Sequence, residues 1–389
     1  MQEFINMTGV SDGKESPVSI KTRSSSHSSS TDRPFSPRDR DRDRDRVMAT
    51  RWGICGAGKI SHDFMVALKT LPASEHQAVG VASRDSSRAR EFAERHEIPK
   101  SYGSYRELAA DPDVDIVYVG IINPEHLKVA LLMLAAGRNV LCEKPLAMNL
   151  HEVQQLVGAA RDKNLFLMEG LWTRFFPVSK AIRALLKENS VGEIKIVKAE
   201  FGMHMMETPR LVEKELGGGV LLDIGCYCLQ FVCMAFHDEK PESIHATGFL
   251  TEKGVDEAVT IVLKYPRKRM AMITVSMATQ LTNQATICGT KGTITVPGYM
   301  WCPTSLVVNG KVQEFPLPPP SQPLNFTNST GLRYEADQVR QCLQKGLKEC
   351  PELPLAESEL IMSILDEARR QLGVVYAQDS LKQERLLIV

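Results

Sequence analysis

A glycine turn between an apolar strand and an amphipathic helix constrains the fold of this chain more than any other feature. Residues 51–55 predict a buried strand, and apolar side chains after the turn repeat at helical spacing through Leu71. Such a turn binds a dinucleotide pyrophosphate, because its glycines permit close backbone approach and the helix N-terminus attracts phosphate. Ser61 replaces the usual third glycine and is still small. The predicted cofactor-binding residues here are Gly56, Gly58, Lys59 and Ile60.

Short apolar strands and helices then alternate through residues 51–168. This alternation predicts a doubly wound parallel sheet, in which ligands lie beyond the carboxyl ends of the strands. We therefore expect an N-terminal Rossmann dinucleotide-binding domain over residues 49–168. The later strands are expected at 77–82, 115–122, 139–142 and 165–168, with a helix over 126–136.

The end of the second strand predicts which dinucleotide binds. NAD enzymes usually have a carboxylate there for the ribose 2′-hydroxyl, but this chain has Ser83 and Arg84. A guanidinium suits a 2′-phosphate, so we expect NADP. Asp85 is one residue late and is predicted to cap the next helix. Arg88 either helps to hold the phosphate or belongs to a solvated helix face.

The tripeptide Glu143-Lys144-Pro145 follows a buried strand at the ligand edge of the sheet. Pro145 keeps Lys144 out of helical geometry, so a lysine is held at the cofactor edge together with Glu143. Lys144 is either catalytic or an ordinary surface lysine at a strand end. Tyr118 and His126 are also expected near the cofactor, although His126 could instead cap its helix.

After residue 168 the pattern changes to one that predicts a second, α+β domain over residues 169–376. Five consecutive strands between 244 and 296 imply an open, largely antiparallel sheet. Trp172 lies in an aromatic cluster at the domain junction, and Phe201 ends an earlier strand. Trp172 is either a substrate wall or interdomain core, and Phe201 is a candidate substrate wall. The remaining expected elements are a strand at 194–202 and helices at 331–346 and 355–376.

Asp223 and Tyr227 lie four residues apart, on one face of an otherwise apolar helix. Buried polar groups need partners. The pair is therefore either catalytic or a tyrosine hydroxyl satisfied by the aspartate in the core.

Composition limits the other possibilities. Lys+Arg and Asp+Glu both number 47, so charge suggests no nucleic-acid or membrane partner. We also expect no apolar run to be long enough to cross a bilayer. The nine cysteines are odd in number and lie in apolar segments, which indicates reduced thiols and a cytoplasmic protein. Their spacing predicts no metal site. Residues 1–48 and 377–389 are expected to be tails.

Taken together, the chain resembles the glucose-fructose oxidoreductase/inositol dehydrogenase/rhizopine catabolism family over residues 49–376. Three stretches carry the resemblance: residues 53–60, 142–145 and 217–225. Within the family, position 227 is often histidine. The tyrosine here is similar to a subgroup that oxidises trans-dihydrodiols of benzene and naphthalene to catechols with NADP+, and also D-xylose. The segment 204–216 departs from that subgroup, and we expect it to line the substrate side.

The resemblance implies hydride transfer to NADP+, with Tyr227 as the general base. Lys144 would hold the substrate hydroxyl and stabilise the tyrosinate, and Asp223 would position the alcohol or the lysine. It also implies a homodimer through the exposed face of the second sheet. Two alternatives stay open: a sugar or inositol dehydrogenase on the same fold, and a non-catalytic NADPH sensor.

Overall fold

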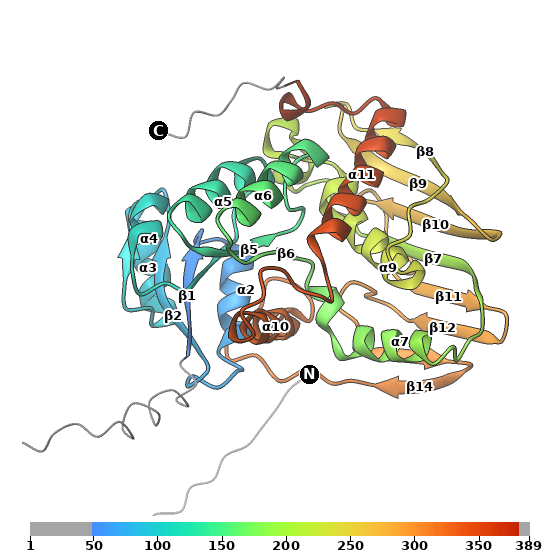
Figure 1. Cartoon of the computed structure of the whole chain (residues 1–389). Helices are drawn as coiled ribbons and strands as arrows, with labels where there is room; N and C mark the ends of the chain where they lie inside the picture. Colours follow the sequence, from blue (N-terminus) through green and yellow to red (C-terminus); the bar gives the residue numbers. More distant parts are fainter. Residues whose placement is uncertain (1–48, 381–389) are drawn as a thin grey trace, which may run out of the picture. The chain divides into compact units, whose positions relative to one another are not determined.

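Two β-sheets organise residues 49–380, the part of the chain that this computed structural model describes (Figure 1). The expectation of a disordered tail at 1–48 concerns residues outside that range, as does the expectation for 381–389. In this part of the chain, packed helices lie between the two sheets and connect them.

The first sheet is parallel throughout, with the order β3-β2-β1-β4-β5-β6, which confirms the predicted doubly wound fold. The order reverses between β1 and β4, and a crevice for ligands opens at such a point. Helices cover both faces, which explains the continuous apolar runs of β4 and β5. The strands are β1 (Thr50–Cys55), β2 (His76–Ala82), β3 (Ser101–Tyr102), β4 (Ile116–Val119), β5 (Asn139–Glu143) and β6 (Leu167–Gly170); the helices are α2 (Lys59–Leu68), α3 (Ser86–His96), α4 (Tyr105–Ala110), α5 (His126–Ala135) and α6 (Leu150–Asp162).

The second sheet has eight strands in the order β14-β13-β12-β11-β7-β10-β9-β8. Every pairing is antiparallel except β7 with β10, which is parallel. The predicted open, largely antiparallel sheet is confirmed, and β13 and β14 extend it beyond the prediction. The strands are β7 (Ile194–Gly202), β8 (Ser243–Leu250), β9 (Asp256–Tyr265), β10 (Arg269–Ser276), β11 (Ala285–Gly289), β12 (Gly292–Val296), β13 (Ser305–Val308) and β14 (Lys311–Glu314).

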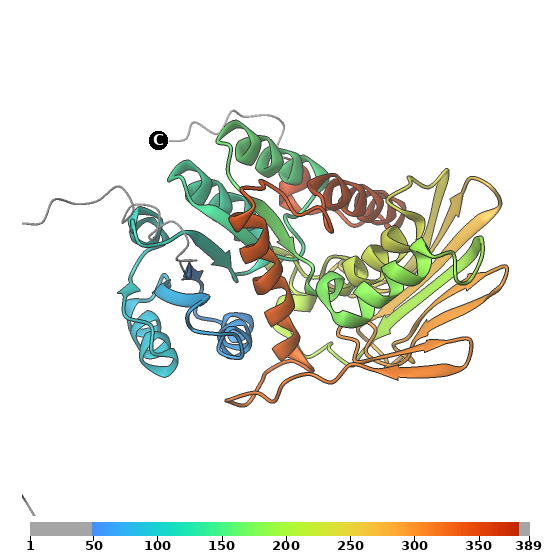
Figure 2. The same cartoon turned by 60° about the horizontal axis from the view of Figure 1, so that its bottom comes forward.

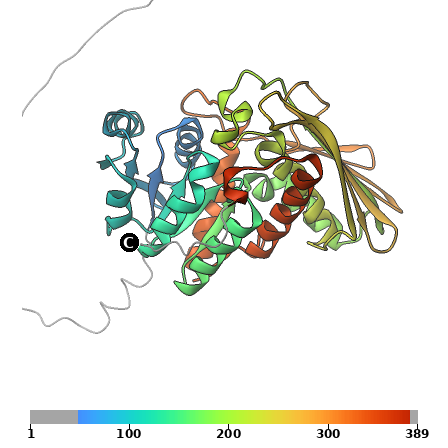
Figure 3. The same ribbon diagram turned by 90° about the horizontal axis from the view of Figure 1, so that it is seen from above.

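Helices α9 (Cys226–Phe236) and α11 (Leu355–Leu372) pack on the inner face of this sheet, towards the first domain (Figure 3). Buried and half-buried side chains alternate along β9 and β10. The buried side chains lie on the face of the sheet that contacts these helices, and the half-buried ones lie on the opposite face. The segment Lys214–Phe236 is long and apolar enough to cross a membrane, contrary to our expectation. Its most apolar window is entirely buried, as in a core segment.

Helix α10 (Leu332–Gln344) returns the chain to the first domain, where it packs against α2 (Figure 2). A loop ending in the turn η5 (Ser329–Gly331) leads into it. The described start of the predicted C-terminal tail is folded, which corrects that expectation. Asp379, in the turn η6 (Ala377–Asp379), forms an ion pair of 2.8 Å with the buried Arg369.

All nine cysteines are free, and all but the half-buried Cys288 are buried. Free buried thiols are what their positions in apolar segments predicted.

Candidate active site

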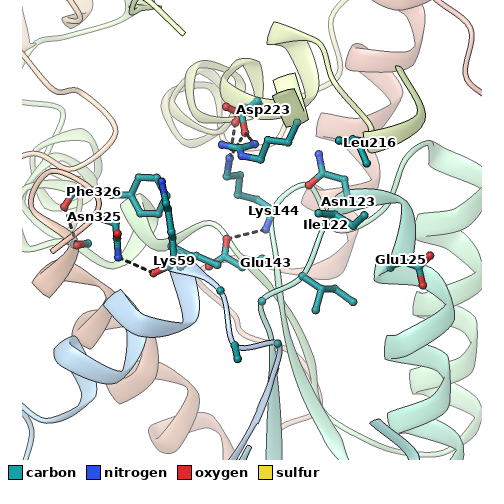
Figure 4. Close-up of a pocket in the computed structure, with 18 of the residues that line it drawn as sticks. Lys59, Ile122, Asn123, Glu125, Glu143, Lys144, Leu216, Asp223, Asn325 and Phe326 are labelled. Atoms are coloured by element: carbon teal, nitrogen blue, oxygen red, sulfur yellow. Dashed lines mark hydrogen bonds and ion pairs between the residues drawn. The ribbon is translucent and has the colours of Figure 1, made fainter. Parts of the chain in front are cut away.

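A cavity of about 800 Å³ lies beyond the carboxyl ends of the first sheet and is closed by residues of the second domain (Figure 4). Both domains contribute to its walls, so residues that are far apart in the sequence line one cavity. Most predicted site residues line this cavity: Gly56, Gly58, Lys59, Ile60, Ser83, Arg84, Arg88, Glu143, Lys144, Trp172, Phe201, Asp223 and Tyr227.

The glycine turn has the geometry that a pyrophosphate needs. Gly56 has φ +102°, and a Cβ there would lie 2.5 Å from the carbonyl oxygen of Gly120. A Cβ on Gly58 would meet nothing nearer than 3.9 Å, so the turn presents bare backbone to the cavity. Helix α2 begins at Lys59, directly after the turn. These residues therefore fit a dinucleotide, because backbone amides and a helix N-terminus face the phosphates.

The end of β2 presents cations to the cavity. Arg84 and Arg88 are exposed and line it. Asp85 caps α3, as predicted, by accepting hydrogen bonds from the backbone amides of Ser87 (2.9 Å) and Arg88 (3.4 Å). These bonds, with one from the Ser87 hydroxyl, lower the pKa of Asp85. The one carboxylate at this strand end is therefore already engaged as a helix cap.

Lys144 and Asp223 form the polar centre of the cavity (Figure 4). Lys144 Nζ donates to the Asp223 backbone oxygen at 2.6 Å and to its Oδ1 at 3.2 Å. Burial by itself would raise the pKa of Asp223, but Lys144 and Arg210 outweigh it and lower the pKa below its ordinary value. Asp223 is thus a fixed anion that orients the lysine. It lies in a π-helical turn, η4 (Leu221–Gly225), and such turns often occur at functional sites.

Tyr227 faces the same cavity from the start of α9. Its hydroxyl accepts a hydrogen bond of 2.9 Å from Trp172 Nε1. Burial raises the pKa of Tyr227 well above its ordinary value, and Cys226 and Glu143 act in the same direction. Lys144 Nζ lies 5.0 Å from the centre of the ring. In this structure Trp172, and not Lys144, is therefore the hydrogen-bond partner of the phenol.

Two predicted cofactor contacts lie outside the cavity lining. Tyr118 is fully buried, and its hydroxyl donates to Glu143 Oε1 at 2.6 Å. His126 is also fully buried, with ring nitrogens 2.8 Å from the Pro145 carbonyl oxygen and 3.1 Å from that of Ile121. Both residues support the cavity wall from behind, which corrects the expected direct contact.

The sequence did not identify several residues of the cavity. Trp301 stacks on Phe201 with ring centres 3.6 Å apart. Arg210, from the divergent segment, donates to Asp223 Oδ1 at 2.7 Å. Trp301 and Arg210 lie far from the glycine turn and the lysine motif in the sequence, so those motifs gave no signal for either. Arg210 does belong to the segment 204–216 that we expected to line the substrate side, and residues of this segment line the cavity. The other lining residues outside the predicted set include Tyr105, Asn123, Glu125, Met203, Met205, Leu216, Asn325, Phe326, Thr327 and Ser329.

Residues 49–380 contain no group of three or more histidine, cysteine, aspartate or glutamate side chains that could hold a metal ion. The glycine turn and the helix after it fit a nicotinamide dinucleotide.

Comparison with known proteins agrees with this geometry. Residues 50–171 match the model described as "Oxidoreductase family, NAD-binding Rossmann fold", and residues 179–295 match the GFO/IDH/MocA C-terminal domain. Among solved structures, levoglucosan dehydrogenase in complex with NADH and levoglucosan has a TM-score of 0.73 at 19% identity, covering 84% of this chain and 98% of its own. At that identity, the likeness shows the fold.

Relatives of known name are much more similar in sequence. Trans-1,2-dihydrobenzene-1,2-diol dehydrogenase from Danio rerio is 59% identical over 86% of this chain and 100% of its own length. The Homo sapiens protein of that name is 51% identical over 85% of this chain and 99% of its own. On these matches, the chain is an oxidoreductase that belongs to the GFO/IDH/MocA family.

Proposed function

We propose that this protein oxidises trans-dihydrodiols of aromatic hydrocarbons to catechols with NADP+, and that it also oxidises D-xylose. The names of relatives 51–59% identical support the dihydrodiol substrate. The observation that carries the proposal is one cavity that combines an ionic centre at Lys144 and Asp223 with aromatic walls. An aromatic dihydrodiol needs both, because its ring is apolar and its reacting carbon bears a hydroxyl.

The side chains divide the work as follows. Lys144 donates to the substrate hydroxyl while Asp223 keeps the ammonium in place. Tyr227 accepts the hydroxyl proton, and Trp172 holds the phenol in position. Phe201 and Trp301 pack against the substrate ring and exclude water. A bound nicotinamide supplies the hydride acceptor. The ketone formed from a dihydrodiol tautomerises to a catechol without further help.

The preference for NADP over NAD rests on the end of β2. Arg84 and Arg88 face the cavity, and Ser83 offers a hydroxyl beside them. Guanidinium groups suit a 2′-phosphate. Asp85, which follows Arg84, is engaged with Ser87 and Arg88.

The test is NADP+ reduction by the purified protein with trans-dihydrodiols, pentoses and inositols, each over a range of concentrations. The proposal expects the highest kcat/KM with a trans-dihydrodiol. A higher value with a sugar or an inositol would favour the sugar dehydrogenase alternative. Tight NADPH binding without turnover of any alcohol would favour a non-catalytic sensor.

We further propose a cytoplasmic homodimer. Free, buried thiols suit a reducing compartment. The outer face of the second sheet is a surface that a second copy of the chain would cover.

A further inference from the structure

The segment between β7 and the glycines before η4 brings one cation into the active-site cavity. This segment contains the short helix α8 (Pro209–Val212), which carries Arg210. Arg210 Nη1 donates to Asp223 Oδ1 at 2.7 Å. Lys144 Nζ lies 3.2 Å from that same oxygen. Two cationic donors from different domains therefore lie side by side on one carboxylate oxygen.

Arg210 has donors to spare. Among residues 49–380 its guanidinium has Asp223 as its one hydrogen-bonding partner, through Nη1. Its side chain is 42% exposed, whereas Asp223 is 7% exposed. A guanidinium carries five N–H donors in a fixed fork, so Nε and Nη2 are available to a ligand in the cavity.

Arg210 is one of two cations that hold the Asp223 carboxylate. Lys144 already holds Asp223 at its backbone oxygen and at Oδ1. Met203 and Met205 from the same connection also line the cavity. Arg210 thus shares the Asp223 carboxylate with Lys144, and it still has N–H donors that this ion pair does not use.

Resting on the proposed function, we infer that Arg210 binds the second, non-reacting hydroxyl of a vicinal diol. Lys144 then holds the reacting hydroxyl on the adjacent carbon, since paired donors match paired oxygens. Arg210 is in this account a specificity-determining residue, and the preferred substrates are vicinal diols over mono-alcohols. An analogue without that hydroxyl leaves the guanidinium without its substrate partner in the cavity, so it is a poorer substrate.

The experiment compares trans-1,2-dihydronaphthalene-1,2-diol with the two mono-alcohols that lack one of its hydroxyls. The wild-type protein should show a kcat/KM at least about tenfold higher for the diol, the effect of one charged hydrogen bond. Arg210→Met should lower that ratio by roughly 10- to 100-fold. Arg210→Lys should lower it less, because it keeps a donor without the fork.

Lys253→Met is the matched control. Lys253 forms an ion pair with Glu213 on the same connection but does not line the cavity. Its variant should keep the wild-type ratio, which separates recognition from general loosening of this segment.

Three results would overturn the inference that Arg210 binds the second hydroxyl. An active wild-type enzyme that oxidises mono-alcohols as well as the diol would overturn the inference, even if no variant folds. An unchanged ratio in Arg210→Met would overturn it too. A fall in kcat/KM of equal size for the diol and both mono-alcohols would overturn it as well, and would leave Arg210 as a positioning residue for Asp223. Failure of the wild-type protein to oxidise any alcohol would instead overturn the proposed function.

Discussion

At the scale of single residues, Tyr227 differs most from the sequence-based expectation. The sequence suggested that the Lys144 ammonium would lower its pKa. In the structure Lys144 donates to Asp223 and lies over the phenol ring, and burial raises the pKa of Tyr227 well above its ordinary value. The phenol is therefore protonated at neutral pH in the protein alone, and it can accept a proton only in its minor, ionised form.

The raised pKa of Tyr227 predicts how kcat changes with pH. Because the ionised fraction of a group with a raised pKa increases with pH, kcat for alcohol oxidation should rise from neutral into alkaline pH. Tyr227→Phe should abolish that rise and lower kcat by about 10²–10⁴, the usual contribution of general base catalysis. Steady-state pH profiles of both proteins measure this. An unaltered profile in Tyr227→Phe would transfer the role of base to Lys144 or to a water that it holds.

Cofactor selectivity is also decided by single residues. Arg84→Asp should weaken NADP+ binding by roughly 10- to 100-fold, since it removes a charged partner of the 2′-phosphate. Titration of intrinsic fluorescence with NADP+ and NAD+ gives both affinities. Arg90→Asp is the control, because Arg90 is exposed on α3, the helix that follows Arg84, and does not line the active-site cavity. Retained NADP+ preference in Arg84→Asp would contradict the assignment.

The sequence could predict most of the cofactor side because its residues lie in short motifs at strand ends. It could not predict side-chain direction: Tyr118 and His126 belong to the correct strand end, yet both point into the core. The sequence also could not predict that Arg210 and Trp301 line the same cavity as Tyr227, because only the tertiary fold brings these segments together.

At the scale of elements, one buried carboxylate joins the two walls of the cavity. Asp63 on α2 is fully buried and accepts hydrogen bonds from the backbone amides of Asn325 and Phe326 and from the Ser329 hydroxyl. The Asn325 side chain also donates to it at 2.8 Å. The helix that follows the glycine turn therefore holds a loop that forms part of the cavity wall.

Asp63→Asn should loosen this loop, because an amide offers fewer acceptors and leaves buried donors unpaired. We expect a loss of about 2–4 kcal/mol in the free energy of unfolding and a higher KM for the alcohol. Denaturant unfolding and steady-state kinetics measure the two effects. Asp113→Asn, at a surface carboxylate that is 55% exposed, should change neither. Wild-type stability in Asp63→Asn would contradict this role.

Hydrophobic periodicity in the sequence predicted the longer helices and strands, but it did not predict the shorter strands. Strands β4 and β5 are continuous apolar runs, and α11 has a clear amphipathic pattern. By contrast, β3 has two residues and β14 is exposed at every position. Such segments carry too little burial to leave a hydrophobic pattern, so their structure depends on neighbouring strands.

At the scale of the whole molecule, the second sheet leaves one face without helices (Figure 3). Large apolar side chains are exposed on its strands, with Phe249 at 74% and Val312 at 61%. Apolar surface of this kind marks interaction sites in soluble proteins. We therefore expect two copies of the chain to pair through this sheet.

The pairing is measured by light scattering coupled to size exclusion at micromolar concentration. The expected mass is that of two chains of 43.3 kDa. Phe249→Glu should shift the mass toward one chain, because it places a charge in the apolar interface. The mass of a single chain for the wild-type protein would contradict the dimer.

The central claim is that Lys144 acts on an alcohol at the polar centre of the cavity. Its most direct test is turnover of trans-1,2-dihydrobenzene-1,2-diol with NADP+ by Lys144→Met, with NADP+ affinity and melting temperature measured in parallel. Lys128→Met is the control, since Lys128 is exposed on α5 and away from the cavity lining. The account predicts that Lys144→Met loses about 10²–10⁴ in kcat while it still binds NADP+, and that Lys128→Met keeps wild-type turnover. Wild-type turnover in Lys144→Met would contradict the account.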